Sequence, residues 1–190
     1  MSPILNSLGG LAARAFGFGS APTAAPFTPS GAYDALASVS VISTVSSIVF
    51  AGIPSGYRHL QIRALTVSNA PSSGVSMQFN GDSSSSYKGH GVYGAGSGTA
   101  NYTVTSPIYA PNFGGGAKTA SPGAAIIDIL DYASTTKNKT IISLDGYDAN
   151  GSGYVGESSG VWFSNSAITS ITLLLSSFTD GAQYALYGVK

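Results

Sequence analysis

The amino-acid sequence predicts an all-β protein, an antiparallel β-sandwich of the jelly-roll type that follows a short N-terminal arm. Three observations predict this fold class. Charged residues make up only 8% of the 190 residues, against about 25% in an ordinary soluble domain. Short runs of β-branched and aromatic residues alternate with turns rich in glycine, serine and asparagine. No helical segment of about ten residues separates these runs, so parallel crossovers are not expected, and the number of strands favours a jelly roll.

Residues 1–19 form an apolar arm that glycines interrupt. The apolar positions recur at helical spacing, and Ser2 and Pro3 supply a cap with proline at the first helical position, which favours a helix. Gly9 and Gly10 each weaken such a helix by about 1 kcal/mol, so the arm is marginal alone. We expect it to fold against a partner, with docking onto its own domain as the alternative. The candidate attachment residues are Ile4, Leu5, Leu8, Leu11, Arg14, Phe16 and Phe18.

After the arm, the chain is expected to divide into a linker and one β domain. Residues 20–32 are rich in proline, alanine and threonine, which is typical of an extended linker. Strand signals then follow one another through residues 33–190, which we assign to the β-sandwich. The predicted strands are Leu36–Ile42, Ser46–Phe50, His59–Val67, Val75–Asn80, Tyr102–Tyr109, Gly123–Tyr132, Thr140–Tyr147, Gly160–Phe163, Ile168–Ser176 and Tyr184–Gly188.

Two of the predicted strands carry informative patterns. Apolar and polar residues alternate over His59–Leu65, so Leu60 and Ile62 are expected on one buried face. The run Ala124–Leu130 is apolar on both faces apart from Asp128. Such a run is typical of a central strand of a packed sandwich.

Two short patterns match catalytic or cofactor motifs but lack the required context. Gly156–Gly160 fits G-x-S-x-G, which works on a strand–turn–helix elbow with a histidine later in the chain. Here a strand is expected to follow, and both histidines, His59 and His90, come earlier. Gly89–Gly94 fits G-x-G-x-x-G, but a loop rather than a helix is expected after it. We interpret that segment as a flexible glycine-rich loop.

Residues 148–153 resemble a calcium loop in part. They offer oxygen ligands at alternate positions and a glycine at the sixth. The glutamate that such a loop carries at its twelfth position is missing, and no flanking helices are expected. A hairpin turn through Asn150 and Gly151 is the preferred interpretation, and the sequence leaves open whether the loop binds a cation.

No local pair of carboxylates suits a glycosidase. Asp128 and Asp131 are three residues apart on a predicted strand and therefore point to opposite faces, and the same holds for Asp145 and Asp148. Trp162 is expected in the core rather than on the surface as a platform for sugars. The sequence therefore predicts no enzyme, no cofactor and no metal site.

Composition argues against several classes of function. The net charge is zero, with eight basic and eight acidic residues, so no basic surface for nucleic acid is expected. Cysteine is absent, which excludes disulfides and zinc–thiolate sites. No membrane span is expected without a run of about 18 apolar residues, and the broken apolar N-terminus does not fit a signal peptide. A near-neutral surface favours association with other proteins.

Four tyrosines stand among glycines and serines in segments expected to include loops. They are Tyr87, Tyr93, Tyr102 and Tyr109. Tyrosine with serine, glycine and asparagine is the composition of adaptable binding loops. Covering a sandwich edge or an oligomer seam explains them equally well. They are therefore candidate ligand or interface residues.

Several segments resemble stretches of small virion proteins of tailed bacteriophages. The resemblance covers about residues 33–190 and ends in the aromatic "LYG"-type terminus of that group. The segments that carry it are Gly52–Arg63, Phe79–Asp82, Ile127–Gly153, Trp162–Leu173 and Tyr184–Lys190. Within the arm, Ala12–Gly17 is similar to short virion-attachment segments of phage proteins. The motifs record strand and turn positions, so they carry over no catalytic residues.

The resemblance implies a capsid decoration (cement) protein, a head fibre or a tail-associated protein. We therefore expect a structural component of the virion that is assembled in the bacterial cytoplasm. Its arm would attach it to capsid-shell or tail proteins, and its β domain would form a homo-oligomer, with a trimer as the favoured state. The alternative is a receptor- or glycan-binding module that recognises a host surface glycan. Head or tail location, copy number, host and receptor stay open.

Overall fold

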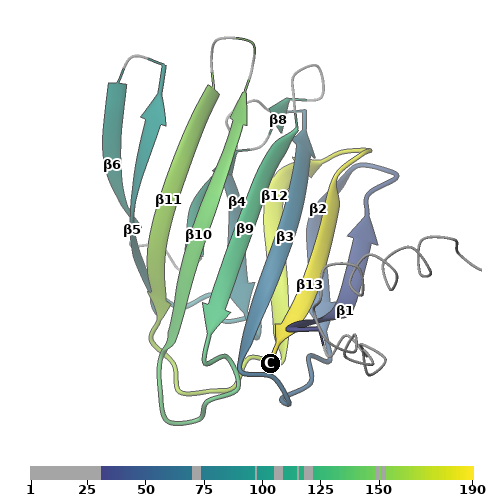
Figure 1. Ribbon diagram of the computed structural model, residues 1–190, viewed down its shortest axis with the longest axis vertical. Coiled ribbons are helices and arrows are strands. Elements are labelled where there is room, and N and C mark those ends of the chain that lie inside the picture. Colours follow the sequence, from purple (N-terminus) through teal and green to yellow (C-terminus); the bar gives the residue numbers. More distant parts are fainter. Residues whose placement is uncertain are drawn as a thin grey trace, which may run out of the picture. The chain divides into compact units, whose positions relative to one another are not determined.

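The computed structural model describes residues 31–69, 74–96, 98–104, 109–114, 116–117, 122–148, 150 and 153–190 (Figure 1). These residues form thirteen β-strands and no helix, which confirms the predicted all-β class. The arm of residues 1–19, with its candidate attachment residues, lies outside the described residues. Within the described part of the chain, no helix is present that could span a membrane. The strands are β1 (Tyr33–Ser40), β2 (Val45–Ala51), β3 (His59–Ser68), β4 (Gly74–Phe79), β5 (Tyr87–Ala95), β6 (Gly98–Val104), β7 (Tyr109–Gly114), β8 (Gly116–Ala117), β9 (Gly123–Leu130), β10 (Lys139–Asp148), β11 (Gly153–Trp162), β12 (Ser170–Phe178) and β13 (Gln183–Val189).

Residues 32–190 form a sandwich of two antiparallel sheets. The first sheet has the order β1-β13-β3-β9-β10-β11-β5-β6. The second has the order β2-β12-β4-β7 and lies behind the first in Figure 1. The two sheets join at one corner, where Ser68 at the end of β3 pairs with Phe178 of β12. The short strand β8 pairs in parallel with that same end of β3.

The strand pairing is that of a jelly roll. When β8 and the hairpins β5–β6 and β10–β11 are set aside, eight strands remain in chain order. The first pairs with the last (β1–β13), the second with the seventh (β2–β12), the third with the sixth (β3–β9) and the fourth with the fifth (β4–β7). This nested pairing is a long antiparallel hairpin that has rolled up into two sheets. The predicted jelly-roll architecture is therefore confirmed.

Two inserted hairpins extend only the first sheet. The β10–β11 hairpin continues the sheet from β9, and the β5–β6 hairpin adds to it through the β11–β5 pair. These four strands enlarge the first sheet from four strands to eight, and β7 at the edge of the second sheet lies against them. The sequence predicts the β10–β11 turn, and its residue Asn150 has the positive φ of 57° that such turns favour. The mutual pairing of the two hairpins was not predicted.

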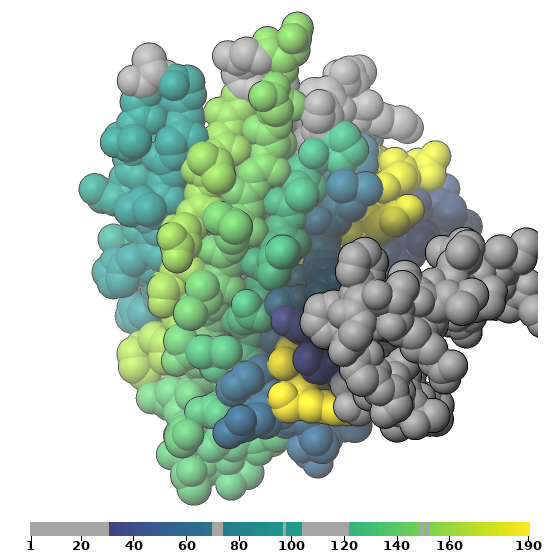
Figure 2. Space-filling view, in the orientation of Figure 1, coloured from purple at the N-terminus to yellow at the C-terminus, as the bar shows by residue number. Residues whose placement is uncertain are grey.

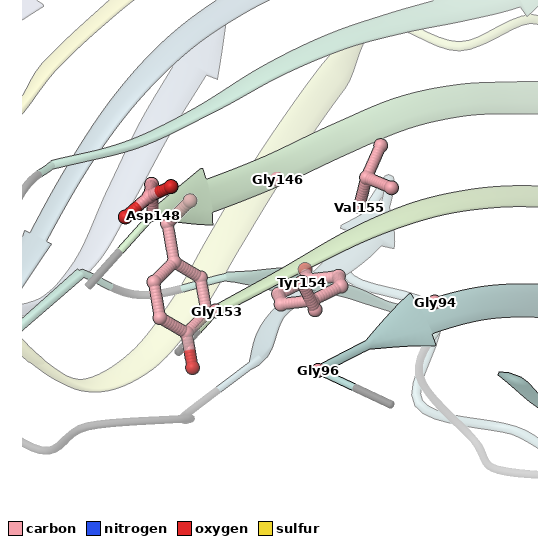
Figure 3. Close-up of a pocket in the computed structure, with 8 residues that line it drawn as sticks. Gly94, Gly96, Gly146, Asp148, Gly153, Tyr154 and Val155 are labelled. Atoms are coloured by element: carbon pink, nitrogen blue, oxygen red, sulfur yellow. The ribbon is translucent and has the colours of Figure 1, made fainter. Parts of the chain in front are cut away.

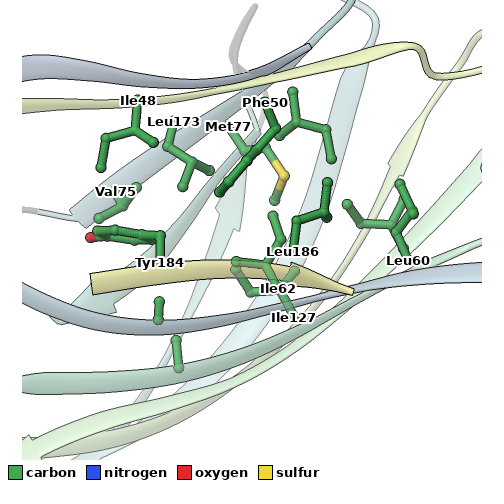
Figure 4. Close-up of a cluster of buried hydrophobic side chains, with 14 of the residues drawn as sticks. Ile48, Phe50, Leu60, Ile62, Val75, Met77, Ile127, Leu173, Tyr184 and Leu186 are labelled. Atoms are coloured by element: carbon green, nitrogen blue, oxygen red, sulfur yellow. The ribbon is translucent and has the colours of Figure 1, made fainter. Parts of the chain in front are cut away.

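The core lies between the two sheets (Figure 4). Leu60, Ile62 and Ile127 point from the first sheet toward Phe50 and Leu173 of the second, and each is buried. The predicted inward face of the His59–Ser68 strand is thus confirmed. Each fully buried side chain of this kind contributes about 1.5–3 kcal/mol relative to an exposed one.

The same core continues to the end of the sandwich where β4, β5 and β11 meet. The Trp162 ring stacks on Tyr87 with centroids 6.3 Å apart and lies 5.5 Å from Phe79. Its Nε1 donates a 2.6 Å hydrogen bond to Oδ2 of Asp82. The prediction that Trp162 belongs to the core is confirmed, since it is 2% exposed.

The predicted glycine-rich loop at residues 89–94 is wrong, because this segment is part of β5. Its glycines alternate with Lys88, His90 and Val92, and β11 and β6 pair with it on either side. Tyr87 is likewise not a loop residue. It is fully buried, and its hydroxyl accepts a 3.0 Å hydrogen bond from the backbone amide of Phe79. The alternation of apolar and polar residues that marks a strand is not visible in this segment, because glycines at the inward positions have no side chain to bury.

The expectation that the Ala124–Leu130 run forms a central strand is confirmed, because β9 pairs with β3 on one side and with β10 on the other. Ala125, Ile127 and Ile129 are buried in the core, but Ile126 on the other face is 46% exposed. The sandwich has two layers, and among the described residues nothing covers the outward side of β9. The strand is central within its sheet yet open on one face.

Candidate functional site

The strands β10, β11, β5 and β6 form what we call the sheet extension. A cluster of tyrosines lies on its inward face, near the β10–β11 and β5–β6 turns. Tyr147 and Tyr154 are cross-strand partners with ring centroids 5.2 Å apart. Tyr93 of β5 continues the row at 6.2 Å from Tyr154, and Tyr102 of β6 lies 6.4 Å from Tyr93. We call these four residues the tyrosine cluster. Edge-to-face pairs at such distances are attractive beyond their buried area.

Small residues beside the tyrosine cluster let its rings lie over the sheet. A Cβ atom added at Gly91 would lie 2.3 Å from the Tyr102 ring, and one at Gly156 would lie 3.1 Å from the Tyr154 ring. The Tyr154 hydroxyl donates a hydrogen bond to the buried carboxylate of Asp145. The rings therefore cover glycine backbone that would otherwise be bare, a known means of stabilising glycines in strands.

Replacing Gly91 with alanine tests this close contact. We expect Gly91→Ala to lower the free energy of unfolding by about 1–2 kcal/mol, because the new methyl group displaces the Tyr102 ring. Gly94→Ala in the same strand is the matched control, since nothing lies within 4 Å of a Cβ atom there. Urea unfolding of both variants measures the difference. Equal stability of the two variants would contradict the packing of Tyr102 on Gly91.

An open pocket of about 570 Å³ lies at the turn end of β5, β10 and β11 (Figure 3). Tyr154 and Val155 are consecutive residues of β11 and therefore face opposite sides of the sheet (Figure 3). Tyr147 is the cross-strand partner of Tyr154 and lies on the same side as Tyr154. Asp148 adds a carboxylate at the rim, and its Oδ1 accepts a 2.7 Å hydrogen bond from the Asn150 amide. The remaining lining residues are Gly94, Gly96, Gly146 and Gly153. Phenol rings beside a carboxylate and accessible backbone are groups that contact sugars by stacking and hydrogen bonding.

The structure places the serine of the G-x-S-x-G pattern in the middle of β11. Ser158 is buried and its hydroxyl shares a 2.5 Å hydrogen bond with that of Ser143. His90 stands opposite Ser159, so its side chain lies on the other face of the sheet from Ser158. No group of three or more histidine, aspartate or glutamate side chains suited to a metal occurs among the described residues. This geometry supplies no serine–histidine contact of the kind that acyl transfer requires.

The outward face of the first sheet is the second candidate site. It carries six large apolar side chains that are each 37–61% exposed. We call them the outer apolar patch, namely Leu65, Val92, Ile126, Ile142, Leu144 and Val155. They come from five neighbouring strands, β3, β9, β10, β11 and β5, which lie side by side in Figure 1. Figure 2 shows this side of the sheet, with β10 and β11 in green.

One basic and one acidic side chain lie in the same cross-strand row as Leu144 and Ile126 of the outer apolar patch. Arg63 of β3 stacks its guanidinium on the Tyr187 and Tyr33 rings, at 4.8 and 5.1 Å from their centroids, and its Nε donates to Oε1 of Gln61. Glu157 of β11 lies between Leu144 and Val92 of the patch and forms no ion pair with any residue that the structure describes.

A scan of known family models found no match to the chain, and a search of curated proteins found none either. The two candidate sites are therefore argued from the geometry alone. Of the four tyrosines singled out by the sequence, Tyr93 and Tyr102 meet in the tyrosine cluster. Tyr87 is in the core, and Tyr109 begins β7. The sequence did not indicate Tyr147 and Tyr154 as site residues, although their spacing across the predicted β10–β11 turn makes them cross-strand neighbours.

Proposed function

We propose that this chain is a structural component of a tailed-phage virion, a decoration, cement or fibre-type protein. Its N-terminal arm attaches it to capsid-shell or tail proteins, and its β domain associates with copies of itself. The role is mechanical and requires no catalytic residue or cofactor. The proposal extends the resemblance of residues 33–190 to phage virion proteins.

The observation that supports the proposal best is the outer apolar patch, a group of six large apolar side chains gathered on one face of the first sheet. Permanent protein interfaces are depleted in lysine, glutamate and aspartate and enriched in apolar and aromatic side chains. Exposed apolar groups gathered on one face mark a protein-contact surface more often than a solvent face. The jelly roll is compatible with the role but does not select it, since the same fold serves capsid proteins and lectins.

Deleting residues 1–26 tests the role of the arm. The deletion precedes β1, which begins at Tyr33, so the compact unit Ala32–Lys190 stays complete. We expect the deleted protein to fold with unchanged stability and its occupancy in purified phage particles to fall at least about tenfold. Quantitative mass spectrometry of the particles measures occupancy, and the full-length protein with the exposed substitution Phe163→Ala is the control. Wild-type occupancy of the deleted protein would refute the proposal.

A receptor- or glycan-binding module is the second candidate function, and the pocket at Tyr147, Tyr154 and Asp148 favours it. Both functions predict a folded β domain, but only this one predicts binding of the purified protein to host polysaccharide. A glycan array followed by titration with Tyr147→Ala separates them. Binding that the substitution abolishes would support the second function, and no binding at millimolar ligand would exclude it.

A further inference from the structure

The outer apolar patch has a register that is close to self-complementary. In one cross-strand row, Leu144 of β10 and Ile126 of β9 are direct neighbours. The next residue outward beyond Leu144 is Glu157 of β11, and the next beyond Ile126 is Arg63 of β3. The row therefore reads acidic, apolar, apolar, basic from β11 to β3. Its two charges stand at equal distances from the line between β10 and β9.

The adjacent row repeats this symmetry with apolar groups. Gly146 of β10 and Ala124 of β9 occupy its centre, flanked by Val155 of β11 and Leu65 of β3. The small central residues let a second surface approach closely. The row on the other side is mixed, with Ile142 of β10 beside Asp128 of β9, which accepts a 2.9 Å hydrogen bond from Gln61. Such a row suits the rim of an interface.

We propose that two copies of this chain pack outer face against outer face, about a two-fold axis that runs parallel to the strands between β9 and β10. This operation places β10 of one copy over β9 of the second copy and β11 over β3. Leu144 then meets Ile126 of the second copy, and Val155 meets Leu65 of the second copy. Glu157 faces Arg63 of the second copy, and the symmetry repeats every contact. This dimer rests on the self-association that the proposed function assigns to the β domain, and it replaces the trimer that was expected from the sequence.

The charges and the size of the face fit a dimer. Stacking on Tyr33 and Tyr187 already orders the Arg63 side chain, so little conformational entropy is lost when it pairs with a carboxylate. Six strands at about 4.8 Å spacing and seven residues at about 3.4 Å rise give a face of roughly 700 Å². A standard interface takes about 800 Å² from each partner. Stacked sheets lie about 10 Å apart and align within about 30°, which leaves room for the Glu157 and Arg63 side chains to meet.

The sequence of β9 supports the same conclusion. The run Ala124–Leu130 has the apolar character of a strand covered on both sides, yet the fold covers one. Packing against a second copy buries Ile126 and supplies the missing layer. The two sheets of the second copy add a third and a fourth layer to the sandwich, which explains why β9 is apolar on both faces.

Two complementary charge reversals test the proposal on the full-length protein. We expect the wild type to sediment as a dimer at about 50 µM, well above a dissociation constant near 1 µM. In Arg63→Glu, the new carboxylate of one copy faces Glu157 of the second copy at both symmetry-related sites, so like charges repel. In Glu157→Arg, the new guanidinium group faces Arg63 of the second copy in the same way. Each variant alone is expected to weaken the dimer at least about tenfold.

An equimolar mixture of the two variants gives the decisive result. In a mixed dimer both charge pairs are opposite in sign again, so the mixture is expected to form dimers although neither variant does so alone. Circular dichroism of each variant checks that it is folded. A wild-type monomer, a wild-type trimer, variants that dimerise like the wild type, or a mixture that stays monomeric would each overturn the proposal. Particle occupancy of the arm deletion is a separate readout, so the two proposals fail independently.

Discussion

Raising the pH above 10 is expected to destabilise the protein steeply, because folding buries several tyrosine hydroxyls in their neutral form. Burial raises the pKa of Tyr87 to about 12, an effect that the hydrogen bond from the Phe79 amide partly offsets. Burial likewise raises the pKa of Tyr184, whose hydroxyl shares a 2.6 Å hydrogen bond with Thr66, and the pKa of Tyr132. These groups therefore keep their protons in the folded state at a pH where the unfolded chain has lost them.

The sign and size of the effect follow from proton linkage. A folded-state pKa above the unfolded value near 10 means that the stabilisation is complete below pH 10 and is lost as the pH rises toward the folded value. For Tyr87 a rise of two units corresponds to about 3 kcal/mol lost between pH 10 and 12, and Tyr184 adds to it. Burial lowers the pKa of Lys139 below its usual 10.5, so that group adds stability as the pH approaches 10.5 and then contributes no further change.

Urea unfolding at half-unit steps from pH 9 to 12 measures this loss, with absorbance at the tyrosinate band as a second signal. Tyr184→Phe is expected to lower the free energy of unfolding at neutral pH and to reduce the alkaline slope. Tyr33→Phe is the control, since that side chain is 43% exposed. A free energy of unfolding that stays constant between pH 10.5 and 11.5 would show that the hydroxyls are not buried as described.

Trp162→Ala is expected to lower the free energy of unfolding by about 3–5 kcal/mol. The substitution removes the ring that packs on Phe79 and Tyr87 and leaves a cavity at the end of the sandwich. The neighbouring Phe163 is 54% exposed, so Phe163→Ala is a matched control that should cost less than about 0.5 kcal/mol. Equal losses for the two variants in urea unfolding would contradict this core.

Trp162→Phe separates the packing of the ring from its hydrogen bond. Phenylalanine keeps most of the apolar contact but cannot donate to Asp82, which should cost about 1.5–3 kcal/mol. Hydrogen bonds from Ser84 and Trp162 lower the pKa of Asp82. Stability from this carboxylate is therefore present above pH 4 and lost as the pH falls through the lowered folded value. The acid-induced loss is expected to be smaller in Trp162→Phe than in the wild type.

The outer apolar patch connects the proposed function with the proposed dimer. A virion protein that associates through this patch keeps its tyrosine cluster free, because the cluster lies on the opposite face of the sheet extension. The arm, the patch and the tyrosine cluster then serve three different contacts, although Gly146 and Val155 line both the pocket and the proposed interface. Each has its own experiment, so the loss of one function leaves the others measurable.

The local sequence pattern was sufficient to predict a strand and its buried face where buried and exposed side chains alternate along the chain. The Leu60 and Ile62 face was predictable because a period of two is a property of neighbouring residues. It failed for β5 and for the first half of β11, where Gly89, Gly91 and Gly156 occupy the inward positions. Those segments are strands because their neighbours supply backbone hydrogen bonds and tyrosine rings, which no local pattern records.

Residues close together in the chain were enough to predict the all-β class, the core position of Trp162 and the turn at Asn150, and the number of strands favoured a jelly roll. The tertiary structure was needed to show that two inserted hairpins pair and widen the first sheet, that Ile126 is exposed on the outward face, and that Glu157 and Arg63 lie in the same cross-strand row. Strand order and register were not predictable because they are set by contacts between distant segments. An apolar run predicts a central strand, but it does not specify what covers each face of that strand.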